Sequence, residues 1–370
     1  MNLTTERESA ERGGPEEGLA SVPIPYRGHE LLAQPLLNKD TAFTEQEREV
    51  FGLRGLLPPR VRTLEEQVAL EIAKIRRKGD ELERFIGIRS ALRILNEPLP
   101  AQRFVFLGAG AASIGIARLV RAQMLRDGAP KDEVRRAIVV LDSQGLTYLG
   151  REPLDADKEE FALGPDELTR YRFAAGERYG LEEVVERVGP SFLFGTSGTP
   201  GTFTEVAIRQ MAAQARIPVI LPLSNPTSKT EARPEDILEW TSGRAIVATG
   251  SPFPPVVRGE LVRVIGQANN AFCFPGIGLG ALVAEAREIT DEMFLSAAEA
   301  LAGTVSQARL EEGALYPNQS SLRDASRAVA IEVARAARDC GVGRNLCDDE
   351  VESVVDAMMW EPRYLPYEPV

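Results

Sequence analysis

The sequence predicts an α/β protein: a Rossmann-like, doubly wound parallel sheet flanked by helices, with a short helical N-terminal segment. Three observations predict this fold. From residue 103 onward, short apolar runs alternate with helical segments, which is typical of a parallel sheet covered by helices on both faces. The first run, FVFL at 104–107, leads through the turn Gly108-Ala109-Gly110 into a helix. The next run ends in an acidic residue, Asp142.

The chain is expected to divide into four segments. They are a disordered tail (1–25), a helical N-terminal segment for oligomerisation (26–97), an NAD(P)-binding Rossmann domain (98–303), and C-terminal helices with a tail (304–370). The first segment carries charge, Gly and Pro without periodicity. The last ten residues, EPRYLPYEPV, are Pro-rich, so they either fray or form an arm that docks on a partner.

Capping patterns place the N-terminal helices. Thr44 and Glu47 form a capping box that begins a short helix, which Gly52 ends. A second capping box at Thr63 begins a helix that runs to about residue 77, and residues 80–88 resemble a further helix.

Apolar runs and helical periodicity place the remaining elements. The expected strands are 104–107, 137–142, 191–196, 217–225 and 244–251, and the expected helices are 114–126, 204–214, 290–302 and 320–340. After Gly276 the chain is expected to be mainly helical.

Composition excludes several classes of protein. Of 370 residues, 44% are apolar and 26% charged, which is typical of globular proteins. The net charge of −12 repels phosphate backbones, so no nucleic-acid partner is expected. No apolar run reaches the roughly 18 residues of a membrane span, and the polar N-terminus lacks a signal-peptide core. We therefore expect no membrane partner and a cytoplasmic location.

Cysteine and histidine usage indicates no metal site. Cys273, Cys340 and Cys347 match no zinc or CxxC spacing, so reduced thiols are expected. The one histidine, His29, lies in a polar stretch where a solvated side chain is expected rather than a catalytic base.

The Gly-rich turn indicates a dinucleotide site. Gly108 permits the tight turn, and Gly110 lets the backbone approach a pyrophosphate at the helix N-terminus. Ser113 replaces the third glycine of the usual pattern. The predicted cofactor-binding residues are Gly108, Gly110, Ala111, Ala112, Ser113, Asp142, Ser143, Thr196, Ser197, Ser224, Asn225 and Asn269. The alternative is a Gly turn that binds nothing, with Asp142 as a helix cap.

The predicted cofactor is NAD. Asp142 can accept hydrogen bonds from ribose hydroxyls and would repel the 2′-phosphate of NADP. No arginine follows it directly, but Ser143 is small and Lys158 lies downstream, so NADP stays open.

Further polar loops are expected at the same edge of the sheet. Asn225, Asn269 and Asn270 offer uncharged amide groups for a small substrate, although turn chemistry would explain them equally well. Lys229 is the candidate catalytic base, against the alternative of a solvated lysine, and Arg244 is a further candidate at the site.

Several long segments resemble malic enzymes. They are RGHELLAQPLLNKDTAFTEQEREVFGLRGLLPPR, LSNPTSKTEA, WTSGRAIVATGSPFPPV, GQANNAFCFPGIGLGAL and ITDEMFLSAAEALA. The resemblance implies that Gly108, Gly110 and Asp142 bind the dinucleotide and that Ser224 lies near it. It also implies that Asn225 and Asn270 face the substrate pocket.

The chain departs from that family before the Gly-rich turn. Malic enzymes carry there a catalytic region with a tyrosine acid, a lysine base, a substrate-binding arginine and acidic metal ligands. Here residues 86–97 alone separate the last N-terminal helix from Pro98, and no tyrosine occurs between Tyr26 and Tyr148. General base catalysis alone is worth roughly 10²–10⁴-fold. Conventional malic enzyme activity and a bound metal are therefore not expected.

Three functions remain open from the sequence. The first is an NAD(P)-dependent oxidoreductase acting on a small hydroxy- or keto-acid without the usual tyrosine, lysine and metal. The second is an NAD(P)-binding pseudoenzyme or regulatory subunit of a full-length malic enzyme, and the third is a redox-neutral enzyme with tightly held NAD.

A homo-oligomer, a dimer through the N-terminal helices, is also expected. Apolar side chains there would need a partner surface: Leu31, Leu32, Leu36, Leu37, Phe51, Leu53, Leu56 and Leu57.

Overall fold

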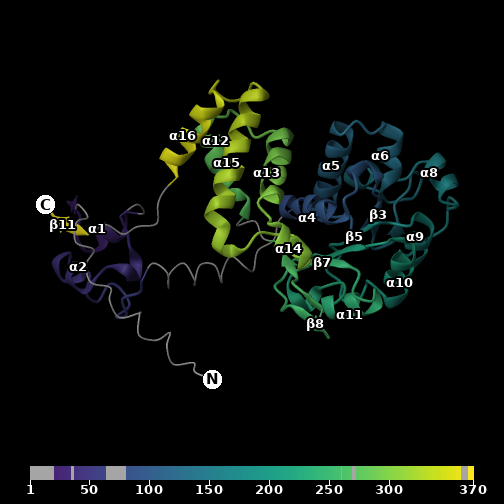
Figure 1. Cartoon of the computed structure of the whole chain (residues 1–370), viewed down its shortest axis with the longest axis horizontal. Coiled ribbons are helices and arrows are strands. Elements are labelled where there is room, and N and C mark those ends of the chain that lie inside the picture. The colour runs from purple at the N-terminus through teal and green to yellow at the C-terminus, as the bar shows by residue number, and fades with distance from the viewer. Residues whose placement is uncertain (1–20, 35–36, 64–80, 260, 269–271, 360–365) are drawn as a thin grey trace. The chain divides into compact units, whose positions relative to one another are not determined.

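The computed structural model describes residues 21–34, 37–63, 81–259, 261–268, 272–359 and 366–370. The chain forms two compact units, one of residues 1–74 with 360–370 and one of residues 75–359 (Figure 1). The predicted domain boundaries stay predictions. The helix α4 (Glu81–Leu95), expected in the N-terminal segment, belongs to the larger unit.

The larger unit is built on a seven-stranded sheet, and the predicted α/β fold is confirmed. Its strand order is β10-β7-β6-β5-β2-β3-β4, and all neighbours are parallel except β3 and β4. The bounds are β2 (Phe104–Leu107), β3 (Ile138–Asp142), β4 (Gly145–Leu146), β5 (Phe192–Gly195), β6 (Val219–Pro222), β7 (Ile246–Thr249) and β10 (Gly266–Gln267).

Side-chain alternation along the strands separates two apolar cores. Phe104 and Phe106 stack on Phe192 and Phe194, with ring centroids 4.9 and 4.7 Å apart, and belong to one core. Val105 faces the other core, together with neighbouring odd-numbered strand residues. Successive strand residues point to opposite faces, so a sheet with two buried faces requires runs of apolar residues.

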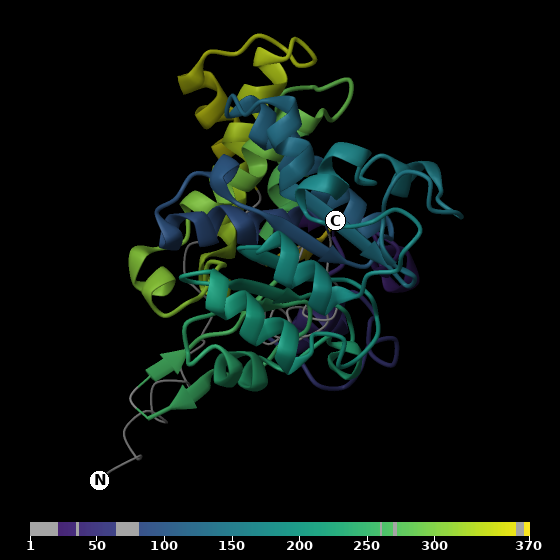
Figure 2. The ribbon, with the colours of Figure 1, turned by 90° about the vertical axis from the view of Figure 1, so that its right-hand side faces the viewer.

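Helices cover both faces of this sheet (Figure 2). One core includes residues of α4, α5 (Ala111–Arg126), α6 (Lys131–Ala137), α12 (Phe274–Val283), α13 (Asp291–Gly303) and α15 (Leu322–Asp339). The other includes residues of α8 (Pro165–Arg170), α9 (Leu181–Val188), α10 (Glu205–Gln214) and α11 (Pro234–Trp240).

Shorter elements connect this framework. They are η2 (Leu99–Ala101), α7 (Ala156–Glu159), η3 (Thr227–Lys229), β8 (Val256–Arg258), β9 (Leu261–Arg263), α14 (Gln307–Glu311) and η5 (Gln319–Ser321). The strands β8 and β9 form an antiparallel hairpin of their own.

The helix α12 packs closely on α15 through two glycines. A Cβ atom on Gly276 would lie 2.6 Å from the Ser326 carbonyl oxygen, and one on Gly280 would lie 2.5 Å from that of Ala330. Both positions therefore require glycine, which explains the spacing of small residues in this apolar helix.

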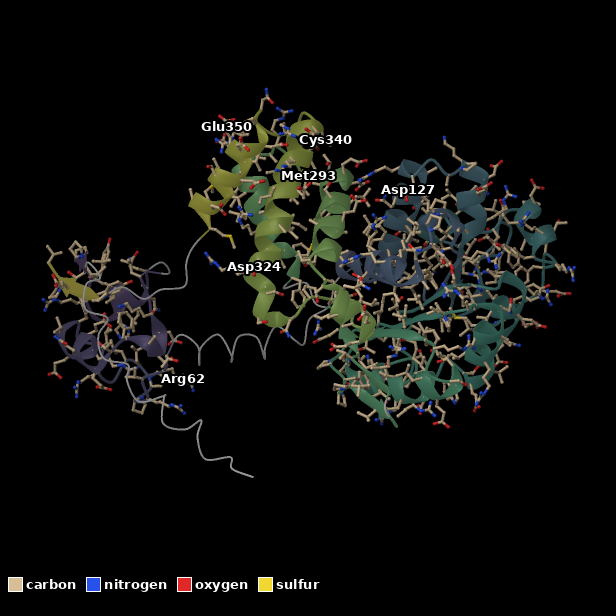
Figure 3. All side chains as sticks on the ribbon, in the orientation of Figure 1. Arg62, Asp127, Met293, Asp324, Cys340 and Glu350 are labelled. Carbon is tan, nitrogen blue, oxygen red and sulfur yellow. The ribbon has the colours of Figure 1, made fainter. Side chains whose placement is uncertain are left out.

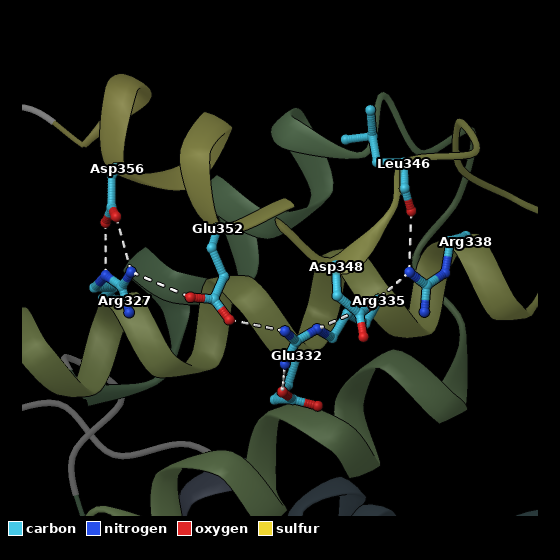
Figure 4. A network of polar contacts seen from close by, with 8 residues as sticks. All are labelled: Arg327, Glu332, Arg335, Arg338, Leu346, Asp348, Glu352 and Asp356. Atoms are coloured by element: carbon cyan, nitrogen blue, oxygen red, sulfur yellow. Dashed lines mark hydrogen bonds and ion pairs between the residues drawn. The ribbon is translucent and has the colours of Figure 1, made fainter. Parts of the chain in front are cut away.

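Ion pairs fasten α16 (Asp348–Met358) to α15 (Figure 4). Arg327 makes two hydrogen bonds to Asp356, of 2.6 and 2.8 Å. Arg335 bonds to Glu352 at 2.9 Å, and Arg338 bonds to Asp348 at 2.7 Å. The side chains are partly exposed, so we expect salt to weaken this attachment.

The smaller unit joins both ends of the chain. It contains β1 (Val22–Ile24), α1 (Gly28–Leu32), η1 (Asp40–Ala42), α2 (Glu45–Val50) and β11 (Tyr367–Pro369). The predicted capping box of Thr44 and Glu47 is present and begins α2. The helix expected after Thr63 lies outside the described residues.

Two expectations about the termini were wrong. Residues 22–24, expected in a disordered tail, pair in parallel with residues 367–369. Residues 366–370 thus pack within the smaller unit, where Tyr367 lies edge-on against Phe43 and Phe51. The isolated patterns of these short segments gave no signal for a strand formed between the two ends.

The physical argument for a dimer through exposed leucines was also wrong. Leu31, Phe51 and Leu53 are fully buried inside the smaller unit, together with Phe43 and Ile24. Leu32, Leu37 and Leu57 pack partly against the same core, Leu56 alone of the described members is exposed, and Leu36 lies outside the described residues. The homo-oligomer stays a prediction without that support.

The three cysteines form no disulfide with one another. Cys273 is buried, whereas Cys340 and Cys347 are exposed (Cys340 is labelled in Figure 3). Among the helices in the described part of the chain, none is long and apolar enough to cross a membrane.

Candidate functional site

The candidate site lies where the sheet topology reverses. The strand β2 pairs with β3 on one side and with β5 on the other. After β2, the chain forms β3 and β4 on one side of β2. It then crosses to the other side, where it forms β5, β6 and β7. In doubly wound sheets, the crevice at the carboxyl ends of the strands at such a point is where ligands bind.

Gly108 makes the turn after β2 possible. Its φ of +117° is a conformation that favours glycine, and a Cβ atom there would lie 2.6 Å from Thr196 Oγ1. The Gly108 amide also donates to the Leu141 carbonyl at 2.8 Å, which ties the turn to β3. The turn therefore lies directly against the loop that follows β5.

Gly110 leaves open space at the N-terminus of α5. It is the N-cap residue of this 16-residue helix, and no side chain caps the helix. A Cβ atom on Gly110 would meet no heavy atom within 4 Å. The first amide groups of a helix have no partner inside the helix and attract anions. The open space and these amides fit the pyrophosphate of a dinucleotide, and Ala111 and Ala112 form the first turn there.

The next predicted residue, Ser113, joins the first turn of α5 to the loop after β5. Its hydroxyl oxygen lies 2.6 Å from Thr196 Oγ1, and Ser113 is fully buried. The position that usually carries a third glycine thus holds a side chain that is hydrogen-bonded to the neighbouring loop.

Asp142 ends β3, as predicted, but its carboxylate is paired. Arg151 donates to its two oxygens at 3.0 and 2.6 Å, and Lys158 Nζ lies 3.8 Å away. Burial opposes ionisation of Asp142, but hydrogen bonds from Arg151 and the Gln144 amide, with both cationic charges, outweigh it and lower the pKa of Asp142.

Arg151 is a functional candidate that the sequence alone did not reveal. It lies nine positions after Asp142, beyond a turn, so no local pattern connects the two. The next residue, Ser143, is exposed, and its carbonyl accepts a hydrogen bond from Arg178 at 3.0 Å. Because Arg151 pairs with Asp142, its positive charge offsets the repulsion that Asp142 was expected to exert on the 2′-phosphate of NADP.

Asn225 presents its amide nitrogen at the ends of β6 and β7. Ser251 donates its hydroxyl hydrogen to Asn225 Oδ1 at 2.6 Å, with the amide oriented to suit this bond. Within the described residues no partner contacts Asn225 Nδ2, so it can donate to a ligand. A Cβ atom on Gly250 would lie 2.9 Å from Asn225 Oδ1, so glycine is needed for this approach.

Ser197 and Ser224 both bond to Glu231, which sequence reasoning missed. The Ser197 amide and hydroxyl donate to Glu231 Oε1 at 2.8 and 3.0 Å. The Ser224 hydroxyl donates to the same oxygen at 2.5 Å and accepts from the Gly198 amide at 2.9 Å. Glu231 is fully buried and joins the loops after β5 and β6. An acidic residue in an otherwise polar loop was its only signal in the sequence.

The remaining candidates differ in their positions. Lys229 is exposed in η3, and its ammonium group has no partner among the described residues, so its role stays a prediction. Arg244 was wrongly expected at the site. It precedes β7 at the opposite edge and bonds to the carbonyls of Ala212 and Arg216. Asn269 and Asn270 lie outside the described residues.

The described part of the chain shows no cluster of side chains that could bind a metal ion. No three His, Cys, Asp or Glu side chains come together there as possible ligands.

Comparison with known proteins identifies what this site resembles. Residues 84–338 match the family model "Malic enzyme, NAD binding domain". NAD-dependent malic enzyme 3 of Bacillus subtilis is 41% identical over 281 residues, which are 76% of this chain and 49% of that protein. The chain thus spans about half the length of the curated relatives it matches.

Solved structures give the same result. The malic enzyme of Entamoeba histolytica is 26% identical, with a TM-score of 0.58, over 75% of this chain and 51% of that one. The malic enzyme of Pyrococcus horikoshii is 25% identical, with a TM-score of 0.57, over 77% of this chain and 59% of that one.

Proposed function

Because the chain belongs to the malic enzyme family through its NAD-binding domain, we propose that it is an NAD-dependent oxidoreductase acting on a small hydroxy- or keto-acid. The resemblance seen in the sequence and the predicted cofactor NAD are both confirmed by this membership. The observation that carries the proposal is the open space at Gly110, at the N-terminus of α5 and near the carboxyl ends of β2 and β5, where the sheet topology reverses.

The pyrophosphate and the adenosine ribose of the dinucleotide would each have a group to hold them. The first amides of α5 would bind the pyrophosphate, and Asp142 would accept hydrogen bonds from the adenosine ribose. In a doubly wound sheet, the other half of the dinucleotide extends past the switch point, here toward the loops after β5 and β6. Bound NAD would supply a hydride acceptor at its nicotinamide ring.

Asn225 would orient the substrate. Its Oδ1 is held by Ser251, which leaves Nδ2 as an uncharged donor in the loop after β6. Such a donor suits the carboxylate of an acid or the carboxamide of the cofactor. Lys229 is the proposed catalytic base, acting as the neutral amine, because it lies four residues further on and its amino group has no partner among the described residues.

A substrate screen tests the activity. The full chain with NAD is incubated with a panel of 2-hydroxy acids, with and without Mg²⁺ or Mn²⁺, and absorbance of reduced nicotinamide is followed. We expect turnover of at least one acid without metal. Metal-dependent malate decarboxylation at about 1 s⁻¹ or more, the low end of ordinary enzyme rates, would contradict the proposal that the chain acts without the usual tyrosine, lysine and metal.

A second function is favoured by the short segment before the Gly-rich turn. Only residues 96–103 separate α4 from β2, so no catalytic region is inserted there. The chain would then be an NAD-binding subunit that pairs with a longer malic enzyme. Co-purification of the two proteins, with no turnover by this chain alone, would favour this alternative. A redox-neutral enzyme would instead retain NAD through gel filtration.

A further inference from the structure

Glu231 is a buried carboxylate for which the proposed function has no role so far. It lies just after η3 and is fully buried. Two hydroxyls and two backbone amides, all from Ser197 and Ser224, approach its oxygens between 2.5 and 3.4 Å. These bonds hold the Glu231 side chain between the loops after β5 and β6.

The space for Glu231 is built into the neighbouring strand. A Cβ atom on Gly195, the last residue of β5, would lie 2.5 Å from Glu231 Cδ. The carboxylate therefore lies against the backbone at the end of β5. Any larger residue at position 195 would displace it.

No cation neutralises this carboxylate among the described residues. The adjacent basic residues point elsewhere, since Arg233 pairs with Glu235 and Lys229 is exposed. Asp142, in contrast, is paired with Arg151 and Lys158. The two sides of the site thus differ in charge. At the end of β3, the negative charge of Asp142 is neutralised by Arg151 and Lys158. At the ends of β5 and β6, the buried negative charge of Glu231 has no cation beside it among the described residues.

The nicotinamide half of a dinucleotide is expected on the β5–β6 side, because Asp142 marks the adenosine half. Oxidised nicotinamide is cationic, whereas reduced nicotinamide is neutral. Charges interact strongly in a site of low dielectric constant. A buried carboxylate beneath the two loops therefore acts differently on the two forms.

We propose that Glu231 is a positioning residue whose buried charge makes the site favour NAD⁺ over NADH. The proposal rests on the proposed function, because it assumes that the crevice binds the dinucleotide. It goes beyond that function by assigning the redox preference of the site to one residue that joins the Ser197 and Ser224 loops.

The test compares the dissociation constants of NAD⁺ and NADH for the full chain and for Glu231→Gln. We expect the ratio of the NAD⁺ constant to the NADH constant to rise about three- to tenfold in the variant, as suits the loss of one charge that acts through a medium of intermediate dielectric constant. A purely structural role would weaken both nucleotides equally, and that result would overturn the proposal.

Two further variants control for charge and shape. Glu231→Asp keeps the charge, so its ratio should stay within about twofold of the wild-type value. Glu235→Gln removes a carboxylate four residues away that is partly exposed and paired with Arg233, and its ratio should not change. A rise in either variant equal to that of Glu231→Gln would contradict the proposal.

Two other outcomes can be told apart from a change in this ratio: a Glu231→Gln variant that does not fold, and a wild-type chain that binds no nucleotide. If Glu231→Gln does not fold, Ser224→Ala decides, because it removes one donor and leaves the charge less screened. A ratio below the wild-type value supports the proposal, and an unchanged or higher ratio contradicts it. If the wild-type chain binds neither nucleotide, the proposed function itself fails.

Discussion

The side-chain oxygens of Ser113 and Thr196 lie 2.6 Å apart and join the first turn of α5 to the loop after β5. Both residues flank the point where the sheet topology reverses. The same loop leaves no room for a Cβ atom on Gly108. One small loop thus fixes the shape of the Gly-rich turn and replaces the third glycine of the usual dinucleotide pattern by a hydrogen bond.

Thr196→Val should destabilise the larger unit. The change keeps the shape of the side chain but leaves the fully buried Ser113 hydroxyl without this partner, which costs about 1–3 kcal/mol. Urea unfolding measures the loss. The double variant Ser113→Ala with Thr196→Val should lose less than the sum of the two single variants. Additive losses would show that the contact contributes nothing.

Arg151→Gln should increase discrimination against NADP. Arg151 offsets the charge of Asp142, and without it the carboxylate repels a 2′-phosphate more strongly. We expect NADP to weaken relative to NAD by about fivefold, or about 1 kcal/mol. Calorimetric titration with both nucleotides measures this, with the exposed Arg209→Gln as control. An unchanged preference would mean that Asp142 does not face the ribose.

The pairing of Asp142 should also appear in acid unfolding. Its pKa is lowered in the folded chain, so the contribution to stability is complete above the ordinary carboxyl value of 3.8 and is lost as pH falls through the folded value. The free-energy difference between wild type and Asp142→Asn should therefore be larger at pH 7 than at pH 3. Equal differences at the two pH values would refute the lowered pKa.

Much of the larger unit could be predicted from local pattern. The strands β2, β3, β5, β6 and β7 and the helices α10, α13 and α15 follow from apolar runs and caps, because they are buried on regular faces. The helix α5 begins three residues before its predicted start, since Gly110 itself is the N-cap. Apolar periodicity does not mark the start of α5, because the backbone conformation of Gly110 sets it.

What the sequence could not reveal were contacts between distant segments. Arg151 reaches Asp142 across a turn, and Glu231 reaches Ser197 across 34 positions. Arg244 was expected at the carboxyl ends of the strands. It precedes β7 and therefore lies at the opposite edge of the sheet. The pairing of residues 22–24 with 367–369 spans nearly the whole chain. Such contacts depend on topology, which no local window contains.

Tyr367→Ala should loosen the smaller unit. The ring lies 3.7 Å from the buried Lys39 ammonium group, and the Tyr367 amide donates to Glu47 at 3.0 Å. Loss of the ring should cost about 2 kcal/mol, because a cation–π contact with a desolvated lysine is of that size. Hydrogen exchange at the β1 amides measures the effect. Val370→Ala, at an exposed side chain, should leave exchange unchanged, and equal protection in both variants would contradict the account.

The central claim is that NAD binds in the crevice at Gly110, and one titration tests it most directly. NAD is titrated calorimetrically into the wild-type chain, Gly110→Val and Gly180→Val. Gly180 is a matched control, because it also caps a helix, has nearly the same backbone angles and would also leave an added Cβ atom without neighbours. The account predicts binding to the wild type and to Gly180→Val, and affinity at least about 100-fold lower, or about 2.7 kcal/mol, for Gly110→Val. Equal affinity in all three proteins, or no binding to the wild type, would contradict it.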